Sequence, residues 1–240
     1  MKKVMSAFGL ALVFSGAVFA QPIDWRERLT EEDLEAGQIH LGMLFNGEAD
    51  GFMRLGWYRD GDNLHLWDRT MFASQEVYEL YEARVNADSL SPQEVRIDFH
   101  TGETSIRWEI GFTSDAANGV MSMSRPGEDA QERSIEAPLP GGVLLRAQTF
   151  MLVDRVELDP GESFSVDWYS SLSNAVETVT FSAIETVDIE TPGGAFTTIR
   201  IEQRGGEPAN DFFVDVETRR IVRIDVGGQP MSFVRLAEPA

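Results

Sequence analysis

The feature that most constrains this chain is a long succession of short strand patterns joined by tight turn signals. Residues 47–72 give a clear example, because Met53, Leu55 and Trp57 occupy every second position before an Asp60-Gly61 turn signal. Alternation of apolar residues predicts a strand with one buried face. An Asp-Gly pair tolerates positive φ and favours a hairpin, so the joined strands are antiparallel. We therefore expect Met53, Leu55 and Trp57 to face the interior.

The same kind of pattern continues to the end of the chain. Three further dipeptides, Asn46-Gly47, Thr101-Gly102 and Asn118-Gly119, carry residues that suit tight turns. The last strands read as a meander that turns at Glu217-Thr218 and Gly227-Gly228. Strands are predicted near 39–46, 51–59, 63–72, 75–86, 92–100, 103–112, 118–124, 131–136, 163–171, 175–189, 194–204, 210–217, 220–227 and 230–236.

One segment departs from the strand pattern. Pro138, Pro140 and the Gly141-Gly142 pair end the preceding strands. The apolar residues that follow, between 143 and 153, fit a helical stripe better than alternation. We therefore predict a helix near 143–153.

These elements predict a mainly β chain built on a long curved antiparallel sheet, a half-barrel or β-spiral, with the helix packed in or across its concavity. Such a curl, a sandwich or a closed barrel is how a chain of this kind manages its sheet edges. Glycines within or beside strands, such as Gly51 and Gly56, favour bending or close approach. Residues 39–240 are predicted to form this single domain. Residues 21–38 precede it and carry a short helix that begins after Thr30 and ends at Gly37.

The first twenty residues have the pattern of an export signal. Lys2 and Lys3 are followed by an apolar run from Val4 to Phe19, and Val18 and Ala20 suit a signal peptidase. We expect a signal peptide over 1–20, cleavage after Ala20 and a periplasmic mature protein. No later run reaches the roughly eighteen apolar residues of a spanning helix, so we predict no membrane-spanning segment after cleavage.

Charge and cysteine content disfavour several classes of function. The chain has a formal net charge of −20, which repels nucleic-acid phosphates and anionic lipid headgroups, so we expect no nucleic-acid partner. The chain has no cysteine, so it has no disulfide, thiol nucleophile or thiolate metal site. Its stability must come from burial of apolar surface.

A search for catalytic patterns gives no catalytic residue, metal site or cofactor. The three histidines, His40, His65 and His100, fall on separate predicted strands without a metal-binding or nucleophile motif. Asp60-Gly61 and the two residues after it resemble the start of a calcium loop, but its twelfth position is Met71. The alternative hypothesis is an envelope hydrolase that uses carboxylate and histidine side chains.

The order of several phrases resembles the bacterial domain-of-unknown-function 3108 family. These phrases are "FNGEADGFMRLGW", "SLSPQEVRIDF", "LLRAQTFMLVD", "VDIETPGGAFTTIRIE" and "NDFFVDVETRRIVRIDV", spread from about Leu41 to Leu236. The chain is also distantly similar to periplasmic β-spiral and lipoprotein-carrier half-barrel proteins. The resemblance implies an exported, strongly curved antiparallel sheet with a helix in its concavity, and no established activity. Phe213 stands where the family often has a tryptophan.

The predicted strands and helix carry many large apolar and aromatic side chains, which fit either a packed core or the lining of an apolar pocket. We predict a non-catalytic periplasmic protein whose curved β surface binds a hydrophobic ligand, such as a lipid, or an envelope protein partner. An outer-membrane barrel fits less well, because most of the predicted strands are shorter than its spanning strands of about ten residues. The candidate ligand-binding residues are Met53, Leu55, Trp57, Trp67, Trp108, Leu145, Phe150 and Trp168.

Overall fold

A computed structural model describes residues 20–237 of the chain, so the signal peptide predicted at 1–20 lies almost entirely outside the described residues. Most of the described residues are in strands. In chain order the elements are β1 (Gln21–Pro22), the 3₁₀-helix η1 (Trp25–Glu27), α1 (Glu31–Glu35), β2 (Ala36–Phe45), β3 (Glu48–Asp60), β4 (Asn63–Phe72), β5 (Val77–Asn86), β6 (Pro92–Thr101), β7 (Thr104–Phe112), β8 (Ala116–Ser124), β9 (Gln131–Pro138), β10 (Leu144–Leu145), α2 (Arg146–Arg155), β11 (Glu162–Ser170), β12 (Ala175–Thr191), β13 (Gly194–Arg204), β14 (Asn210–Asp215), β15 (Ile221–Val226) and β16 (Met231–Val234).

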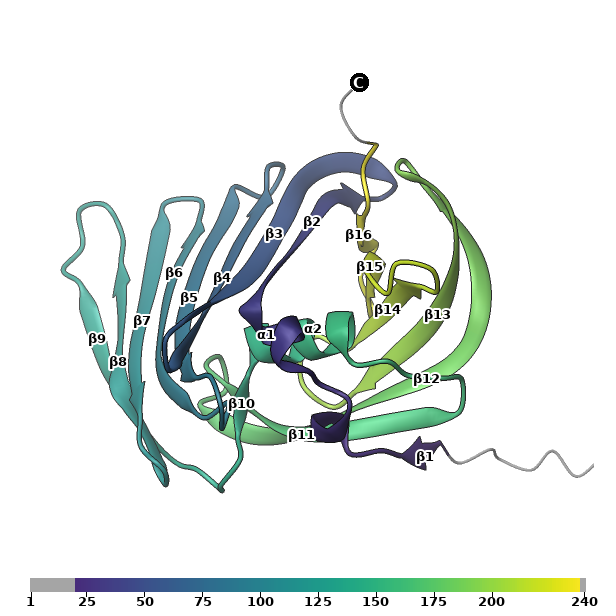
Figure 1. Cartoon of the computed structure of the whole chain (residues 1–240). Helices are drawn as coiled ribbons and strands as arrows, with labels where there is room; N and C mark the ends of the chain where they lie inside the picture. Colours follow the sequence, from purple (N-terminus) through teal and green to yellow (C-terminus); the bar gives the residue numbers. More distant parts are fainter. Residues whose placement is uncertain (1–19, 238–240) are drawn as a thin grey trace, which may run out of the picture.

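All sixteen strands belong to one long sheet that curls on itself without closing (Figure 1). Its order is β1-β11-β12-β13-β14-β15-β16-β2-β3-β4-β5-β6-β7-β8-β9, and β10 pairs with β11. The pairs are antiparallel except for β1 and β10, which run parallel to β11. In this order β16 pairs with β2 and so joins the strands β11–β16 to the strands β2–β9. The predicted fold class, a curved antiparallel sheet, is confirmed.

Helices α1 and α2 lie inside the curl, as Figure 1 shows, so the predicted position of the helix is also confirmed. Its predicted range, 143–153, is wrong at both ends. Leu144 and Leu145 are extended and pair with Trp168 and Tyr169 of β11, and the helix covers Arg146–Arg155 instead. The sequence pattern could not show where the extended segment ends and the helix begins. Because α2 is buried on most of its sides, it has no polar, solvent-facing side that would reveal a helical repeat.

The short helix predicted after Thr30 is present as α1, but its predicted end is wrong. The Thr30 hydroxyl accepts a hydrogen bond from the Asp33 amide, and the Asp33 carboxylate accepts one from the Thr30 amide. The helix ends at Glu35, and Gly37 already lies in β2. A Cβ at Gly37 would lie 2.1 Å from Cζ2 of Trp57. Gly37 therefore makes room for a large side chain instead of ending a helix.

Most of the predicted turns are present. Asn46 and Gly47 both have positive φ, as do Gly61 and Gly102, which agrees with their turn assignments. The turn predicted at Asn118-Gly119 is wrong, because both residues lie within β8. A Cβ at Gly119 would lie 2.1 Å from the carbonyl oxygen of Glu109 on β7, so this glycine permits two strands to approach closely.

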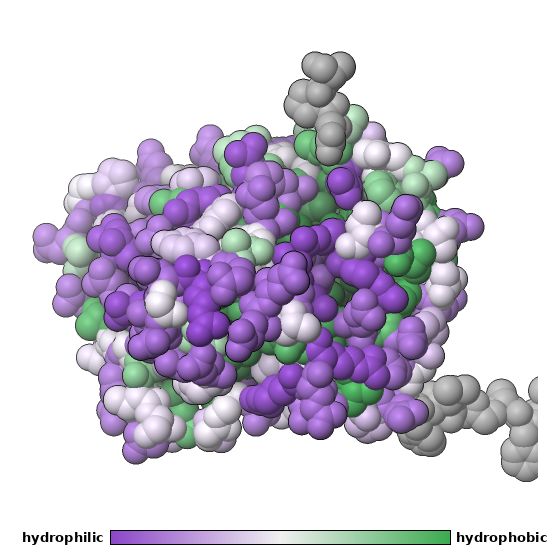
Figure 2. All heavy atoms as spheres, in the orientation of Figure 1, coloured by the Kyte–Doolittle hydropathy of each residue, from purple (hydrophilic) through white to green (hydrophobic). Residues whose placement is uncertain are grey.

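The interior of the curl is one continuous hydrophobic core. Met53, Leu55 and Trp57 are each 4% exposed or less, which confirms that they face inward. The face of the molecule drawn in Figure 2 is covered mainly by hydrophilic residues, with hydrophobic ones visible in the gaps between them. Figure 1, drawn from the same side, looks into the curl, in which the two helices lie.

Replacement of Leu145 by asparagine tests whether the segment before α2 belongs to this core. Leu145 is 1% exposed, so Leu145→Asn should lower the free energy of unfolding by about 2–5 kcal/mol, the cost of removing a large buried apolar group. Urea denaturation followed by circular dichroism measures this change. Leu172→Asn is the matched control, since Leu172 is 75% exposed and its replacement should change stability by less than about 0.5 kcal/mol. Equal effects of the two substitutions would contradict the packing described here.

Candidate functional site

The functional candidates predicted from sequence fall into three places. Met53, Leu55 and Trp57 lie in the core on β3, the strand that contacts both α1 and α2. Trp67 faces outward from β4, because its ring lies over Gly56 on the outer face of β3. Leu145 and Trp168 lie together beside a small pocket, described below. The other two, Trp108 and Phe150, pack in the core beside Ile97 and Phe212 respectively.

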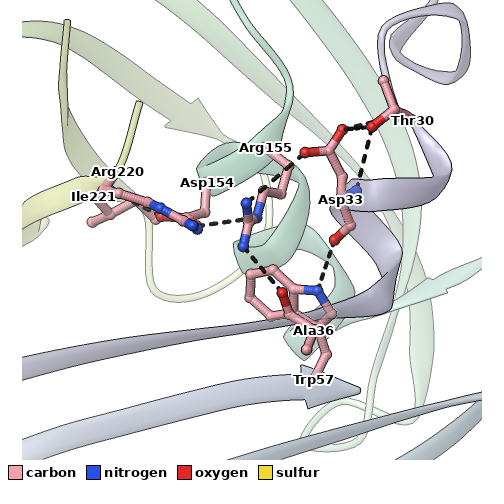
Figure 3. Close-up of polar contacts among 8 residues, drawn as sticks. All are labelled: Thr30, Asp33, Ala36, Trp57, Asp154, Arg155, Arg220 and Ile221. Carbon is pink, nitrogen blue, oxygen red and sulfur yellow. Dashed lines mark hydrogen bonds and ion pairs between the residues drawn. The ribbon is translucent and has the colours of Figure 1, made fainter. Parts of the chain in front are cut away.

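Trp57 of β3 is held in place by groups from two helices, as Figure 3 shows. Its indole N–H donates to the carbonyl oxygen of Asp33 in α1 at 2.8 Å. The guanidinium of Arg155, in the last turn of α2, lies 4.9 Å from the centre of the Trp57 ring. Arg155 Nη1 is also 3.9 Å from the carboxylate of Asp33. Trp57 therefore serves to join α1, α2 and β3, which is a structural role.

The end of α2 is fixed to the sheet by Asp154. Its carboxylate, which is fully buried, accepts hydrogen bonds from Arg220 Nη1 at 2.8 Å and from the backbone amide of Ile221 at 3.0 Å. Figure 3 shows Asp154 lying between Arg155 and Arg220. Burial raises the pKa of Asp154 and outweighs these bonds, which act to lower it.

The start of α2 is fixed to the opposite part of the sheet by Arg146. Its guanidinium forms ion pairs with Asp68 of β4, at 3.4 Å, and with Glu79 of β5. It also lies 5.0 Å from the centre of the Tyr81 ring. Burial, with a smaller contribution from Glu79, raises the pKa of Asp68 to about 6 against the opposing effect of Arg146. Burial likewise raises the pKa of Tyr81. Two inward carboxylates therefore share this single cation.

Gln148 adds a third attachment for the helix. It is fully buried, and its side-chain oxygen accepts a hydrogen bond from the Leu145 amide at 2.9 Å. Its side-chain nitrogen donates to the carbonyl oxygen of Leu90, in the turn between β5 and β6, at 2.8 Å. The helix therefore begins at a fixed position against the β5–β6 turn, which sets where Arg146 and Leu145 lie.

The two ends of the curled sheet approach each other along what we call the seam, defined by Phe112 and Glu136 on one side and Tyr169 and Asn174 on the other. The rings of Phe112 and Tyr169 meet edge to face with their centres 5.3 Å apart. Asn174 Nδ2 donates to the carbonyl oxygen of Glu136 at 3.4 Å. In the described sheet β9 and β11 are not paired, so the seam is held by side chains instead of a ladder of backbone hydrogen bonds.

A small pocket of about 60 Å³ lies beside the seam. We call it the seam pocket. Its wall combines apolar and aromatic side chains with a few polar ones, and its residues come from β5, β6, β10, the start of α2, β11 and two loops. The residues that define it are Tyr81, Val95, Ile97, Leu145, Arg146, Trp168, Tyr169, Ser170, Ser171, Leu172, Glu207 and Pro208.

Trp168 is the chemically distinctive residue of the seam pocket. The residue is 3% exposed, yet its indole N–H has no hydrogen-bond partner among residues 20–237. One side of its ring lies against Gly206, where a Cβ would be 3.4 Å from the ring. A buried donor without a partner costs about 1–3 kcal/mol. Trp168 therefore carries a buried donor that no group among the described residues satisfies.

The histidines do not assemble with the inward carboxylates. His65 stacks on Tyr58, and His100 Nδ1 lies 2.8 Å from the hydroxyl of Ser105 at an exposed pair of strands. His40 lies beside Arg54, and burial and this neighbour lower its pKa. Within residues 20–237 no three metal-ligating side chains cluster together, and no helix is long and apolar enough to cross a bilayer.

Sequence reasoning missed the polar residues that position the site, namely Arg146, Asp68, Glu79, Asp154 and Gln148. A signal was present, because Arg146 and Asp154 are charged residues in an apolar stretch. Charges inside a buried helix require partners elsewhere in the chain. Their partners are 78 and 66 residues away, however, and the sequence does not indicate which acids or arginines they are.

Comparisons with known proteins give no family for the chain. No protein-family model matches it, and no curated protein matches it, so the resemblance to family 3108 remains a prediction. Among solved structures it is similar to a β-barrel-like protein of domain-of-unknown-function family DUF1849 from Brucella abortus, with 11% identity and a TM-score of 0.48 over 84% of this chain and 95% of that one. A second, a "putative exported protein with YmcC-like fold" from Bacteroides fragilis, has 9% identity and a TM-score of 0.29 over 90% and 96% of the two chains.

The raised pKa of Asp68 predicts a pH dependence of stability. The folded state binds the Asp68 proton more tightly than the unfolded chain does, so this contribution is fully present below the ordinary pKa of 3.8 and is lost as pH rises through about 6. The stability of the natural protein relative to Asp68→Asn should therefore fall between pH 4 and pH 7, by at most about 3 kcal/mol at 1.4 kcal/mol per pKa unit. Urea denaturation of both proteins across this range measures the difference. Stability curves that stay parallel would contradict the prediction.

Proposed function

We propose that the protein is an exported, non-catalytic binding protein that holds an apolar molecule carrying a hydrogen-bond acceptor, such as a lipid acyl group, in the seam pocket. The observation that carries this proposal is the buried Trp168 N–H, which has no partner among residues 20–237 and belongs to a pocket wall with several apolar and aromatic side chains. The export pattern of residues 1–20 supports a periplasmic location, where such a ligand is available. The proposal needs no cofactor or metal.

The size of the seam pocket limits what it holds in the described conformation. Sites for whole drug-sized ligands have volumes of about 300–1,000 Å³. At about 60 Å³ the seam pocket has room for one end of a ligand only. The rest of an acyl chain would lie along the rim, where Leu172 is 75% exposed and offers apolar surface.

The seam gives a route by which a larger part of a ligand enters. Separation of β9 from β11 breaks the Asn174–Glu136 hydrogen bond and the Phe112–Tyr169 ring contact, and it breaks no backbone ladder. A net hydrogen bond contributes about 0.5–1.5 kcal/mol and an aromatic pair a similar amount. Such an opening leaves the pairing of β9 with β8 and of β11 with β12 in place.

Replacement of Trp168 by phenylalanine tests the proposal, because it removes the indole N–H and keeps an aromatic ring. Binding of oleic acid to the full chain, measured by isothermal titration calorimetry, should become about five- to tenfold weaker, which is what the loss of one hydrogen bond predicts. Trp67→Phe is the matched control, since Trp67 faces outward over Gly56.

Two results would contradict the proposed function. One is the absence of oleic acid binding to the natural protein, together with the absence of any co-purified lipid in native mass spectrometry. The other is equal weakening of binding in the Trp168→Phe and Trp67→Phe proteins, which would place the ligand away from the seam pocket.

A further inference from the structure

We propose that the unpaired edge of β2 and the basic cleft beside it bind an acidic peptide in extended conformation, which adds to the sheet as a further strand. This surface shares no residue with the seam pocket, and the proposal does not depend on the proposed function. The sequence predicts an envelope protein partner as one alternative but does not show where it binds. This proposal gives that partner a binding site.

The unpaired edge arises from the difference in length between two neighbouring strands. β2 extends over Ala36–Phe45 and pairs with β3 along that whole length. On its other side it pairs with β16, whose four residues reach only Gly42–Phe45. Residues 36–41 of β2 therefore have no strand beside them in the described sheet. A strand edge with unpaired backbone groups is a template for another chain.

As far as Ala237, where the described residues end, the chain that follows β16 forms no backbone hydrogen bond with residues 36–41. The amide of Arg235 donates to the carbonyl oxygen of Val222 at 2.8 Å, and its own carbonyl oxygen accepts from the Gly193 amide at 2.9 Å. These bonds tie Arg235 to β15 and to the β12–β13 turn, while the next residue, Leu236, lies over Gly42 of β2 and lines the neighbouring cleft together with Ala237. One backbone group of this edge is already bonded, because Arg155 Nη2 donates to the carbonyl oxygen of Ala36 at 3.4 Å. The free part of the edge is residues 37–41.

Beside this edge lies a cleft of about 740 Å³, which we call the basic cleft. It is lined by residues 37–41 of β2 and, on its other sides, by Phe52, Arg54, Asp154, Arg220, Ile221, Arg235, Leu236 and Ala237. The edge thus opens onto a space large enough for an extended chain.

The charge of the basic cleft is opposite to that of the whole protein. The chain carries a formal net charge of −20, whereas the cleft is lined by three arginines, His40 and a single acid, Asp154. That acid is already paired with Arg220 at 2.8 Å. Arg54 and Arg235 have no ion-pair partner among residues 20–237, and each lies over a phenylalanine ring instead.

Arg54 also lies directly opposite Arg69 on the next strand. Like charges placed opposite each other on a sheet face destabilise it. An acidic partner would relieve this repulsion, and charge complementarity of this kind speeds association and selects partners. The edge supplies backbone hydrogen bonds, and the arginines supply the preference for acidic side chains.

Titration calorimetry with the full-length protein and a synthetic peptide of alternating glutamate and valine tests the proposal. The natural protein should bind this peptide and should not bind a matched peptide in which lysine replaces glutamate. Arg54→Gln and Arg235→Gln should each weaken binding by about tenfold, the effect of losing one favourable charge contact. Arg133→Gln, which makes the same charge change on β9, should leave the affinity unchanged. No binding of the glutamate peptide, or equal loss in all three variants, would overturn the proposal.

Strand addition is tested separately with peptides methylated at backbone nitrogens. Alternate amides of an extended peptide face opposite edges. Two peptides of the same sequence are therefore made, each methylated at one of the two alternating sets of amides. One should lose binding and the other should bind as the parent does, because only one set pairs with β2. Equal binding by both would overturn the assignment to the β2 edge. Trp168→Phe should not change peptide affinity, so failure here and failure of the proposed function are distinguishable.

Discussion

The attachment of α2 inside the curled sheet is the interaction on which the rest of the structure depends. Arg146 stands at the first position of the helix and Asp154 near its end, which is the reverse of what the helix dipole favours. Ion pairs with residues of the sheet offset this unfavourable placement of both charges. Arg146 pairs with Asp68 and Glu79, and Asp154 pairs with Arg220. The helix thereby connects β4 and β5 to β15 across the interior, and the sheet can stay open without losing its core.

An open sheet has edges, and both proposed binding sites lie at these edges. At the seam, side chains of Phe112, Tyr169 and Asn174 replace a backbone ladder. At the basic cleft, the short β16 leaves part of β2 unpaired. One edge borders the seam pocket with its unused donor, and the other borders a group of arginines. Both arrangements suit a protein that holds its partners, and neither requires a reacting group.

The sequence predicts the strands well because each depends on local pattern, as with Met53, Leu55 and Trp57 on one face of β3. It predicts poorly where a residue's role depends on distant neighbours. Gly119 looks like a turn residue until β7 is placed against it, and Gly37 looks like a helix end until Trp57 covers it. Of the predicted ligand-binding residues, Leu145 and Trp168 lie together at the seam pocket, which only the register of β10 on β11 brings about.

Native-state hydrogen exchange of α2 tests the central claim most directly. The amide of Val156 donates to Leu152 at 2.7 Å and reports on the last turn of the helix, beside Asp154. If α2 holds the curled sheet together, this amide and those of β3 and β4 should exchange only on global unfolding, with the same free energy and the same dependence on urea. Exchange of the α2 amides at a free energy several kcal/mol lower, while β3 and β4 stay protected, would contradict the account.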